Sequence, residues 1–264
     1  MKIKLKTIAL LVLMTICQQA ICQSTKTTVK VLSFNILHGA TTKGDFDLDR
    51  IAKVILDTNP DLVALQEVDF KTNRAKKYDL VTELGWRTKM APLFAQAMPF
   101  DGGGYGEGIL SKSSFLQTRN VALPFSLGNE PRSAAEITTI LSSGDTIFFV
   151  GTHLDHLKDE SDRISQAREI NRAFSTNKFP GILAGDLNAT PESKTIKIFE
   201  EFWTPSYDKN DPNPTFPSDN PTKKIDYVMF YPKNRWRVVE TRVIQDAVAS
   251  DHCAYLVTLE LMGK

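Results

Sequence analysis

Apolar residues recur along this chain with two periods, and together they predict alternating strands and helices. Continuous β-branched and aromatic runs predict buried strands at residues 29–36 and 61–68. Apolar side chains at helical spacing predict helices over residues 47–57, 74–84, 162–174 and 192–202. Further strands are predicted at residues 86–89, 106–111, 115–123, 132–141, 146–152, 179–185, 225–231, 236–243 and 254–261.

Strands dominate this order, in hairpin-like runs with helices between them. Such an order is typical of an α/β (α+β) fold in which two mixed, mostly antiparallel sheets pack together with helices on their outer faces. No repeat and no linker rich in Gly and Ser divides residues 27–262, so we expect one domain there. The glycine-rich residues 101–106 match no nucleotide-binding fingerprint and are interpreted as a mobile connecting loop.

Residues 1–22 have the pattern of a secretory signal peptide. Three lysines precede an apolar run at residues 8–16, which is too short to span about 30 Å of hydrocarbon. Cleavage is expected after Cys22, and with it export to the periplasm or the medium without stable membrane insertion. The alternatives are a buried helix, a membrane anchor or a lipoprotein signal. The last would need a small residue where Ile21 stands.

Composition and charge narrow the class of protein. With 42% hydrophobic and 24% charged residues, wholesale disorder is excluded. The formal charge is +1, and loss of the three lysines with the signal peptide makes it −2. Proteins that hold nucleic acid by bulk electrostatic attraction usually carry a strong basic excess, which this chain lacks. Only Cys253 would remain after cleavage, so the fold has no internal disulfide and this thiol is expected to be buried.

Polar side chains stand at the ends of several predicted strands. They are Asn35, Glu67, His153, Asp186, Asn188, Asp226, Asp251 and His252. Any one of them alone is most often a turn residue, but adjacent strands bring their ends together in one cleft. Carboxylates gathered there would repel one another unless a cation neutralised them. An oxygen-rich set without cysteine suits a hard cation such as Mg²⁺ rather than a structural zinc ion.

Six short motifs occur in a fixed order along the chain. They are Ser33-Phe34-Asn35, residues 61–68 (DLVALQEV), residues 151–154 (GTHL), residues 185–188 (GDLN), Ile225-Asp226-Tyr227 and Ser250-Asp251-His252. The series resembles the endonuclease/exonuclease/phosphatase superfamily, which includes deoxyribonuclease I, abasic-site endonucleases, neutral sphingomyelinases and inositol polyphosphate 5-phosphatases. The resemblance covers residues 29–261. It implies a four-layer α/β/β/α sandwich with its site at one end of the two sheets.

The resemblance also implies a metal site. Glu67 would be the main ligand, with Asn35 beside it ordering the metal or the phosphate. Asp251 would lie at or near a second metal position. The cofactor would be Mg²⁺, with Mn²⁺ as an alternative. Whether one or two ions bind is left open by the sequence.

Proton transfer would fall to another set of residues. By resemblance, Asp186 is expected to act as the general base toward the attacking water, although family members divide over whether this residue only orients the water. Asn188 would donate a hydrogen bond to the phosphoryl oxygens. His252 would hold a phosphate oxygen while its ring is hydrogen-bonded to Asp226. His153 would stabilise the transition state or protonate the leaving oxygen.

Three further positions match the family less regularly. Glu107 falls where the deoxyribonuclease branch has a glutamate that orients the histidine corresponding to His153, but many relatives have Asn there. Arg132 is expected either to contact a substrate phosphate or to form a surface ion pair. Phe216 is expected to contact the substrate at the rim.

The remaining histidines have plainer interpretations. His38 is interpreted as a loop residue. His153 and His156 belong to a His-x-Asp-His run of the kind that binds zinc in metallo-β-lactamase-like hydrolases. That family has another histidine two residues earlier, where this chain has Gly151, so Asp155 and His156 are interpreted as steadying the loop before the next helix.

These patterns predict an exported, Mg²⁺-dependent phosphoesterase that cleaves a phosphodiester or phosphomonoester by direct attack of water. The substrate would be a nucleic acid, a phospholipid headgroup or a sugar or inositol phosphate, and the protein is expected to be a monomer. A calcineurin-like metallophosphatase would need Asp-x-His and Gly-Asn-His-Asp/Glu motifs that the chain lacks. A non-catalytic binding module would be favoured if Glu67, Asp186 or His252 had been lost, and all three are present.

Overall fold

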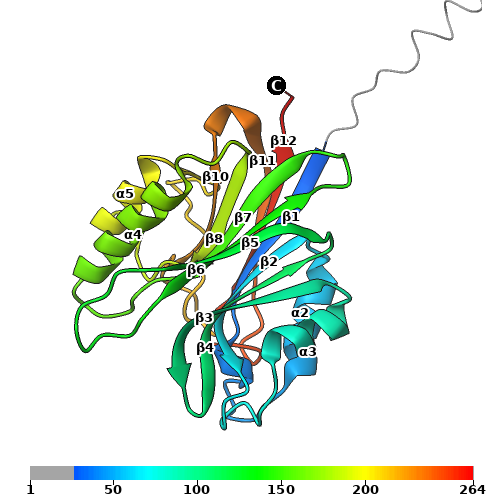
Figure 1. The fold of residues 1–264 in the computed structure, drawn as a ribbon, viewed down its shortest axis with the longest axis vertical. Helices are drawn as coiled ribbons and strands as arrows, with labels where there is room; N and C mark the ends of the chain where they lie inside the picture. Colours follow the sequence, from blue (N-terminus) through cyan, green and yellow to red (C-terminus); the bar gives the residue numbers. More distant parts are fainter. Residues whose placement is uncertain (1–26, 264) are drawn as a thin grey trace, which may run out of the picture.

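The computed structural model describes residues 27–263, which form four layers (Figure 1). Within these residues, two six-stranded sheets pack face to face. Helices α2 and α3 cover the outer face of one sheet, and α4 and α5 cover the outer face of the other. The predicted α/β/β/α sandwich is therefore confirmed. The predicted signal peptide, residues 1–22, lies outside the described residues.

The first sheet has the strand order β11-β12-β1-β2-β4-β3. Its strands are β1 (Thr27–Asn35), β2 (Leu62–Phe70), β3 (Ala91–Phe100), β4 (Gly103–Ser111), β11 (Trp236–Ile244) and β12 (Ala254–Leu261). Strands β1 and β2 are parallel, and the other neighbours in this sheet are antiparallel.

The second sheet has the order β5-β6-β7-β8-β10-β9. Its strands are β5 (Phe115–Ala122), β6 (Ser133–Ile140), β7 (Thr146–His153), β8 (Gly181–Asp186), β9 (Thr204–Pro205) and β10 (Asp226–Tyr231). Here β7 and β8 are the parallel pair. Both sheets are thus mixed and mostly antiparallel, as the sequence predicts.

The helices are α2 (Leu48–Thr58), α3 (Leu80–Thr88), α4 (Ser161–Phe174) and α5 (Lys194–Glu200), with short 3₁₀ turns η1 (Leu37–Gly39) and η2 (Lys233–Arg235). Aspartates set two of the helix starts. The side chain of Asp47 accepts a hydrogen bond from the amide of Arg50 at 3.0 Å and caps α2. Asp79 caps α3 in the same way, through the amide of Thr82 at 3.2 Å.

Two predictions around α3 are wrong. The helix predicted at residues 74–84 begins only at Leu80, and the strand predicted at residues 86–89 is the last part of this helix. Residues 74–77, before the cap residue Asp79, instead form a turn that is held by a residue distant in sequence. The amide of Arg74 donates to the carboxylate of Asp101 at 2.7 Å. This long-range contact outweighs the local helical pattern.

The glycine-rich segment 101–106 also differs from its prediction. Residues 103–106 belong to β4, and only Asp101 and Gly102 form the turn between β3 and β4. A side chain at Gly106 would lie 2.1 Å from the carbonyl oxygen of Ala95 on β3. Glycine is therefore needed there because the two strands approach closely, and not because the segment is a loop.

Three apolar clusters hold the layers together. One lies between the sheets and includes Phe149 and Val257, both fully buried. A second joins the first sheet to α2 and α3, and a third joins the second sheet to α4 and α5 around Trp203. Each large apolar side chain buried in this way contributes about 1.5–3 kcal/mol. No helix within residues 27–263 combines the length and the apolar character needed to cross a bilayer.

Candidate active site

The strand directions bring the predicted polar residues to one end of the sandwich. Strands β1, β7 and β8 end there at Asn35, His153 and Asp186. Antiparallel neighbours begin at the same end, and Asp226, the first residue of β10, is paired directly with Asp186. His252 lies just before β12, the antiparallel partner of β1. The topology therefore gathers residues that are scattered along more than two hundred positions.

The two sheets approach closely enough near this end for their residues to contact one another. A side chain at Gly151 on β7 would lie 3.3 Å from the Cβ atom of Ala64 on β2. Glycine thus allows the sheets to pack closely beside the site. As a result, Asn35 of the first sheet reaches the second sheet, with its Nδ2 atom 3.3 Å from Oδ2 of Asp186.

Glu67 enters the site because β2 contains a bulge. The register between β2 and β4 shifts between Leu65 and Val68, and Glu67 has a left-handed φ of 56°. Strained backbone of this kind costs free energy and is concentrated at functional sites. The side chain is half-buried, and its Oε1 accepts from Nδ2 of Asn35 at 3.1 Å.

Glu67 is ionised at neutral pH. Burial by itself would raise its pKa, but the hydrogen bonds from His38 and Asn35 outweigh burial and lower the pKa of Glu67 to about 2. The Nδ1 atom of His38 lies 3.5 Å from Oε2 of Glu67. His38, interpreted from sequence as a loop residue, therefore contacts the predicted metal ligand.

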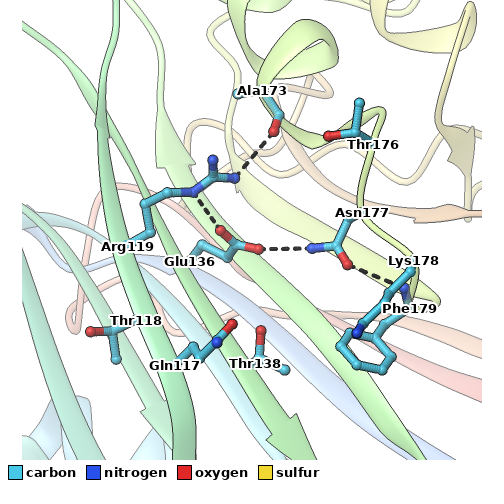
Figure 2. A pocket seen from close by; sticks show the side chains of 10 residues that line it. All are labelled: Gln117, Thr118, Arg119, Glu136, Thr138, Ala173, Thr176, Asn177, Lys178 and Phe179. Atoms are coloured by element: carbon cyan, nitrogen blue, oxygen red, sulfur yellow. Dashed lines mark hydrogen bonds and ion pairs between the residues drawn. The ribbon is translucent and has the colours of Figure 1, made fainter.

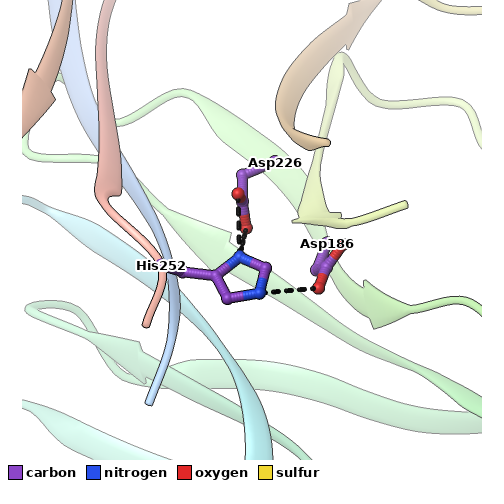
Figure 3. A group of neighbouring side chains, drawn as sticks. All are labelled: Asp186, Asp226 and His252. Carbon is purple, nitrogen blue, oxygen red and sulfur yellow. Dashed lines mark hydrogen bonds and ion pairs between the residues drawn. The ribbon is translucent and has the colours of Figure 1, made fainter. Parts of the chain in front are cut away.

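His252 bridges two carboxylates (Figure 3). Its Nδ1 lies 3.1 Å from Oδ2 of Asp226, and its Nε2 lies 3.6 Å from Oδ2 of Asp186. Burial disfavours the charged imidazole, but the two carboxylates outweigh it and raise the pKa of His252 to about 10. Burial also raises the pKa of Asp186 to about 7, against the opposing effect of His252. The contact that the resemblance implies between His252 and Asp226 is thus present.

His153 lies on the other side of Asp186. Its Nε2 is 3.4 Å from Oδ2 of Asp186 and 3.0 Å from Nδ2 of Asn188. Asn188 itself has a left-handed φ of 48°, and its backbone N–H donates to Oδ1 of Asp186 at 2.9 Å. Burial and the nearby Arg132 hold the pKa of His153 well below its usual value, so this imidazole is neutral.

Glu107 does not make the contact that the resemblance implies. It is fully buried, and within residues 27–263 neither carboxyl oxygen has a hydrogen-bond partner. Burial raises its pKa, which favours the protonated form. Nδ1 of His153 instead lies 3.2 Å from Nη1 of Arg132. Arg132 is only 2% exposed but lines the cleft, and its Nη1 lies 3.3 Å from Oε1 of Glu130, so the predicted ion pair is present at the wall of the cleft and not on the open surface.

The site opens into a cleft of about 460 Å³. Its walls include Phe216, whose ring centre lies 4.8 Å from that of His252, and the carboxylate of Asp251. Burial raises the pKa of Asp251. The Oγ atom of Ser250 donates to the backbone carbonyl oxygen of Asn35 at 2.7 Å and lies 3.4 Å from Oδ1 of Asp251.

Sequence reasoning missed several cleft residues. They are His38, Arg74, Met98, Phe100, Tyr105, Glu130 and His156. Arg74 forms a pair of hydrogen bonds with the buried Asp69, and its guanidinium lies 4.5 Å from the ring centre of Phe100. Asp155 does steady its loop, because its side chain accepts from the amide of Leu157 at 3.0 Å. The signal for His156 was its closeness in sequence to His153.

The donor set fits a hard cation better than zinc. Asp186, Asp226 and His252 have ligand atoms within 4.8 Å of one another, but those atoms are already engaged in the contacts described above. Glu67 offers an ionised, partly exposed carboxylate, with Asn35 and Asp251 nearby in the same group of side chains. A second cation is disfavoured at Nδ1 of His153, because the Arg132 guanidinium already lies there.

A larger cavity, about 680 Å³, lies away from these residues at the end of α4 and along β5 and β6 (Figure 2). Two of its charged groups, Arg119 and Glu136, are paired with each other. Glu136 accepts from Nε of Arg119 at 2.7 Å and from Nδ2 of Asn177 at 3.0 Å. None of the predicted site residues lines it. The charges of Arg119 and Glu136 therefore offset each other, whereas several donors of the cleft converge on Asp186.

Solved structures share this fold. A protein of the endonuclease/exonuclease/phosphatase group from Beutenbergia cavernae is 22% identical, with a TM-score of 0.71, over 89% of this chain and 72% of its own. The human Nocturnin catalytic domain with bound sulfate is 18% identical, with a TM-score of 0.68, over 90% and 97%. A mannosyl-6-phosphatase from Bacteroides thetaiotaomicron is 17% identical, with a TM-score of 0.66, over 88% and 99%.

Sequence comparison leads to the same group. None of the curated proteins compared with the chain gives a significant match. The model of the endonuclease/exonuclease/phosphatase family, however, matches residues 32–252, which contain all six motifs. With the motifs, the four layers and the cleft in agreement, the chain belongs to the endonuclease/exonuclease/phosphatase family.

Proposed function

We propose that this protein is a divalent-metal-dependent phosphoesterase that hydrolyses its substrate by direct attack of water. One observation carries the proposal. The Oδ2 atom of Asp186 lies within 3.3–3.6 Å of three nitrogen atoms, on Asn35, His153 and His252. A carboxylate surrounded by donors in a cleft can accept a proton from water while the donors hold the phosphoryl group.

The charge of each side chain in the cleft indicates its role in hydrolysis. His252 is protonated at neutral pH and would bind a negatively charged phosphoryl oxygen, with Asp226 fixing its ring. His153 is neutral and, like Asn188, would act as a hydrogen-bond donor without adding charge. Asp186 has a pKa near neutrality, which suits a residue that takes a proton from water and later releases it.

Glu67, with Asn35 and Asp251, would hold Mg²⁺ or Mn²⁺. A carboxylate is a ligand that hard cations prefer, and Asn35 would act by ordering Glu67, since its Nδ2 donates to Glu67 while its Oδ1 accepts from the backbone amide of Leu37 at 3.1 Å. When bound, the cation would neutralise negative charge on the phosphoryl group. The role of the chain is to keep Glu67 deprotonated and aimed at the cleft, which the bulge in β2 and the hydrogen bond from Asn35 achieve.

The size and lining of the cleft favour a small phosphate ester. A volume of about 460 Å³ is within the usual range of about 300–1,000 Å³ for small-molecule sites. Phe100, Tyr105 and Phe216 offer apolar faces to the part of the substrate that is not hydrolysed. The Nocturnin catalytic domain has a bound sulfate anion and the Bacteroides neighbour is a mannosyl-6-phosphatase, which supports an oxyanion ligand for proteins of this fold.

The test is a panel of esters assayed with Mg²⁺, Mn²⁺ or EDTA. The panel contains plasmid DNA, RNA, bis-p-nitrophenyl phosphate, p-nitrophenyl phosphate, inositol phosphates, mannose 6-phosphate and sphingomyelin. We expect turnover of at least one ester with a metal, none in EDTA, and a rate at least about a hundredfold lower in His252→Ala. Glu201→Gln, an exposed change at the end of α5, should behave as the wild type. Turnover in EDTA, or a near-wild-type rate in His252→Ala, would contradict the mechanism, and no turnover of any ester would favour a non-catalytic binding module.

We also propose that the protein is exported. The proposal rests on the basic start and the short apolar run within residues 1–22. Cell fractionation and mass spectrometry of the purified protein should find a chain that begins at Gln23, outside the cytoplasm. A protein that keeps Met1 would contradict cleavage, and one found in the cytoplasm would contradict export.

A further inference from the structure

Arg132 lies behind two histidines of the cleft and contacts both. It directly precedes β6 and is only 2% exposed. Its Nη1 lies 3.2 Å from Nδ1 of His153, and its Nη2 lies 3.2 Å from Nδ1 of His156. Nη1 also lies 3.3 Å from a carboxylate oxygen of Glu130. Both terminal nitrogens of the guanidinium are therefore engaged within the protein.

The chemistry of arginine decides which ring nitrogen carries the proton in each histidine. A guanidinium can only donate hydrogen bonds. The Nδ1 atoms of His153 and His156 must therefore accept, so each has a lone pair there. A neutral imidazole has a single N–H, and in both rings that proton must then be on Nε2.

His153 has a donor beside each ring nitrogen, and the charges of its neighbours decide between the two tautomers. Nε2 lies 3.4 Å from the acceptor Oδ2 of Asp186 and 3.0 Å from the donor Nδ2 of Asn188, which also donates to the backbone carbonyl of Leu154 at 3.1 Å. Nδ1 faces only the charged guanidinium of Arg132 among the contacts described, and a charged donor forms the stronger hydrogen bond. The lone pair is therefore stabilised at Nδ1, and the proton at Nε2 beside the Asp186 carboxylate.

Two residues of α4 hold the loop that carries His156. The buried Arg163 of α4 donates to the carbonyl oxygen of Asp155 at 3.0 Å, and Gln166 accepts from the amide of Asp155 at 2.9 Å. With the loop and Nδ1 both held, the ring of His156 lines the cleft, and no residue of 27–263 forms a hydrogen bond with its Nε2. The sequence had assigned this residue only to steadying the loop.

We propose that Arg132 is a positioning residue that holds His153 and His156 by their Nδ1 atoms, so that each presents a protonated Nε2 to the substrate. His156 thereby becomes a second hydrogen-bond donor in the cleft, available to an oxygen of the phosphate ester. Arg132 acts through the two rings and not by contacting the substrate. The catalytic meaning of this arrangement rests on the proposed phosphoesterase function, whereas the arrangement itself does not.

The first test needs neither substrate nor mutation of Arg132. Two-dimensional ¹⁵N–¹H spectra of the histidine-labelled wild-type protein distinguish the two neutral tautomers, and the signals are assigned by their loss in His153→Gln and His156→Gln. We expect the Nε2–H form for both residues. A dominant Nδ1–H form in His153 would overturn the proposal, whether or not an ester substrate has been found.

The second test uses kinetics once a substrate is known. In Arg132→Met, kcat should fall on the order of tenfold to a hundredfold with little change in KM, and the His153 signal should move toward the Nδ1–H form. Arg132→Lys, which keeps one donor, should recover part of kcat. Arg119→Met, at the distant cavity, is the matched control and should leave both constants unchanged. A rise in KM with kcat preserved in Arg132→Met would mean that Arg132 binds the substrate directly, and would refute the positioning role. Should Arg132→Met fail to fold, Arg132→Lys and the wild-type spectra still decide.

Discussion

Asp186 and Asp226 are directly opposite each other on the antiparallel strands β8 and β10. Two carboxylates in this position repel, and such pairs destabilise a sheet. His252 lies against both, at 3.6 Å from Asp186 and 3.1 Å from Asp226, and its positive charge offsets the repulsion. The strand register therefore places the two aspartates side by side. His252, which lies just before β12, stabilises the pair. Four predictions follow from this site and from the packing beside it.

Replacing either partner of the His252–Asp226 pair should impair catalysis. We expect His252→Ala to lower kcat/KM by about 10²–10⁴-fold, because the phosphoryl group loses its cationic partner. Asp226→Asn should cost less, since the imidazole remains but is no longer held or charged as strongly. Steady-state kinetics on the best ester of the panel measures both. Asp57→Asn, an exposed change on α2, is the control. Near-wild-type rates in His252→Ala would show that this histidine does not touch the reacting group.

The rate should depend on pH in a bell shape. Asp186 must be ionised to accept a proton, and burial raises its pKa to about 7, so activity should rise as the pH increases through this region. His252 must keep its proton, and the two carboxylates raise its pKa to about 10, so activity should fall above that pH. A bound cation would shift the acidic limb downward. In Asp186→Asn the acidic limb should disappear along with most of the activity. An unchanged limb in the residual activity of this variant would assign the titration to another group.

Glu67 should control the affinity for the metal. Its pKa of about 2 keeps it ionised at neutral pH, and Glu67→Gln removes that charge while retaining the shape of the side chain. We expect the concentration of Mg²⁺ or Mn²⁺ needed for half-maximal activity to rise about tenfold or more. Calorimetric titration of the metal alone gives a readout independent of turnover. Equal metal affinity in Glu67→Gln and in the surface control Glu201→Gln would place the cation elsewhere.

The close packing of the two sheets should be sensitive to one methyl group. In Gly151→Ala the new Cβ atom would meet Ala64 at 3.3 Å and Ile109 at 3.4 Å, with a β-carbon on one side and a core isoleucine on the other. We expect the free energy of unfolding to fall by about 1–3 kcal/mol, because the sheets must separate slightly. Denaturant unfolding followed by circular dichroism measures it. Gly263→Ala, where no atom lies within 4 Å, should leave stability unchanged. An equally stable Gly151→Ala protein would mean that the interface can adjust freely.

The elements that the sequence predicted correctly are those whose signals are local. The apolar face of α4 and the continuous apolar run of β2 each specify their structure within about ten residues. Strand β3, in contrast, was not predicted. It contains Pro92 and Pro99, and proline argues against a strand because it cannot donate a backbone hydrogen bond. The two prolines are tolerated because β3 lies at the edge of its sheet. Whether a strand is at an edge depends on the order of the whole sheet.

The site divides in the same way. The chain order of Asn35, Glu67, Asp186 and His252 at strand ends was sufficient to predict that they meet, because the ends of neighbouring strands share one edge. The partner of His153 was not predictable, since it depends on which side chain of the adjoining strands reaches its ring. Arg132 reaches it, and Glu107 does not.

The sequence by itself therefore determined the layered architecture, the family and the identity of the acids and histidines at the strand ends. Short-range periodicity and the residue types of the motifs encode these properties. Only the tertiary structure decided the bulge that turns Glu67 into the cleft, the charge shared by His252 with two carboxylates, and the contact of Arg132 with His153 and His156. These depend on register and on the distance between packed sheets, which are set by the contacts of many residues far apart in the chain.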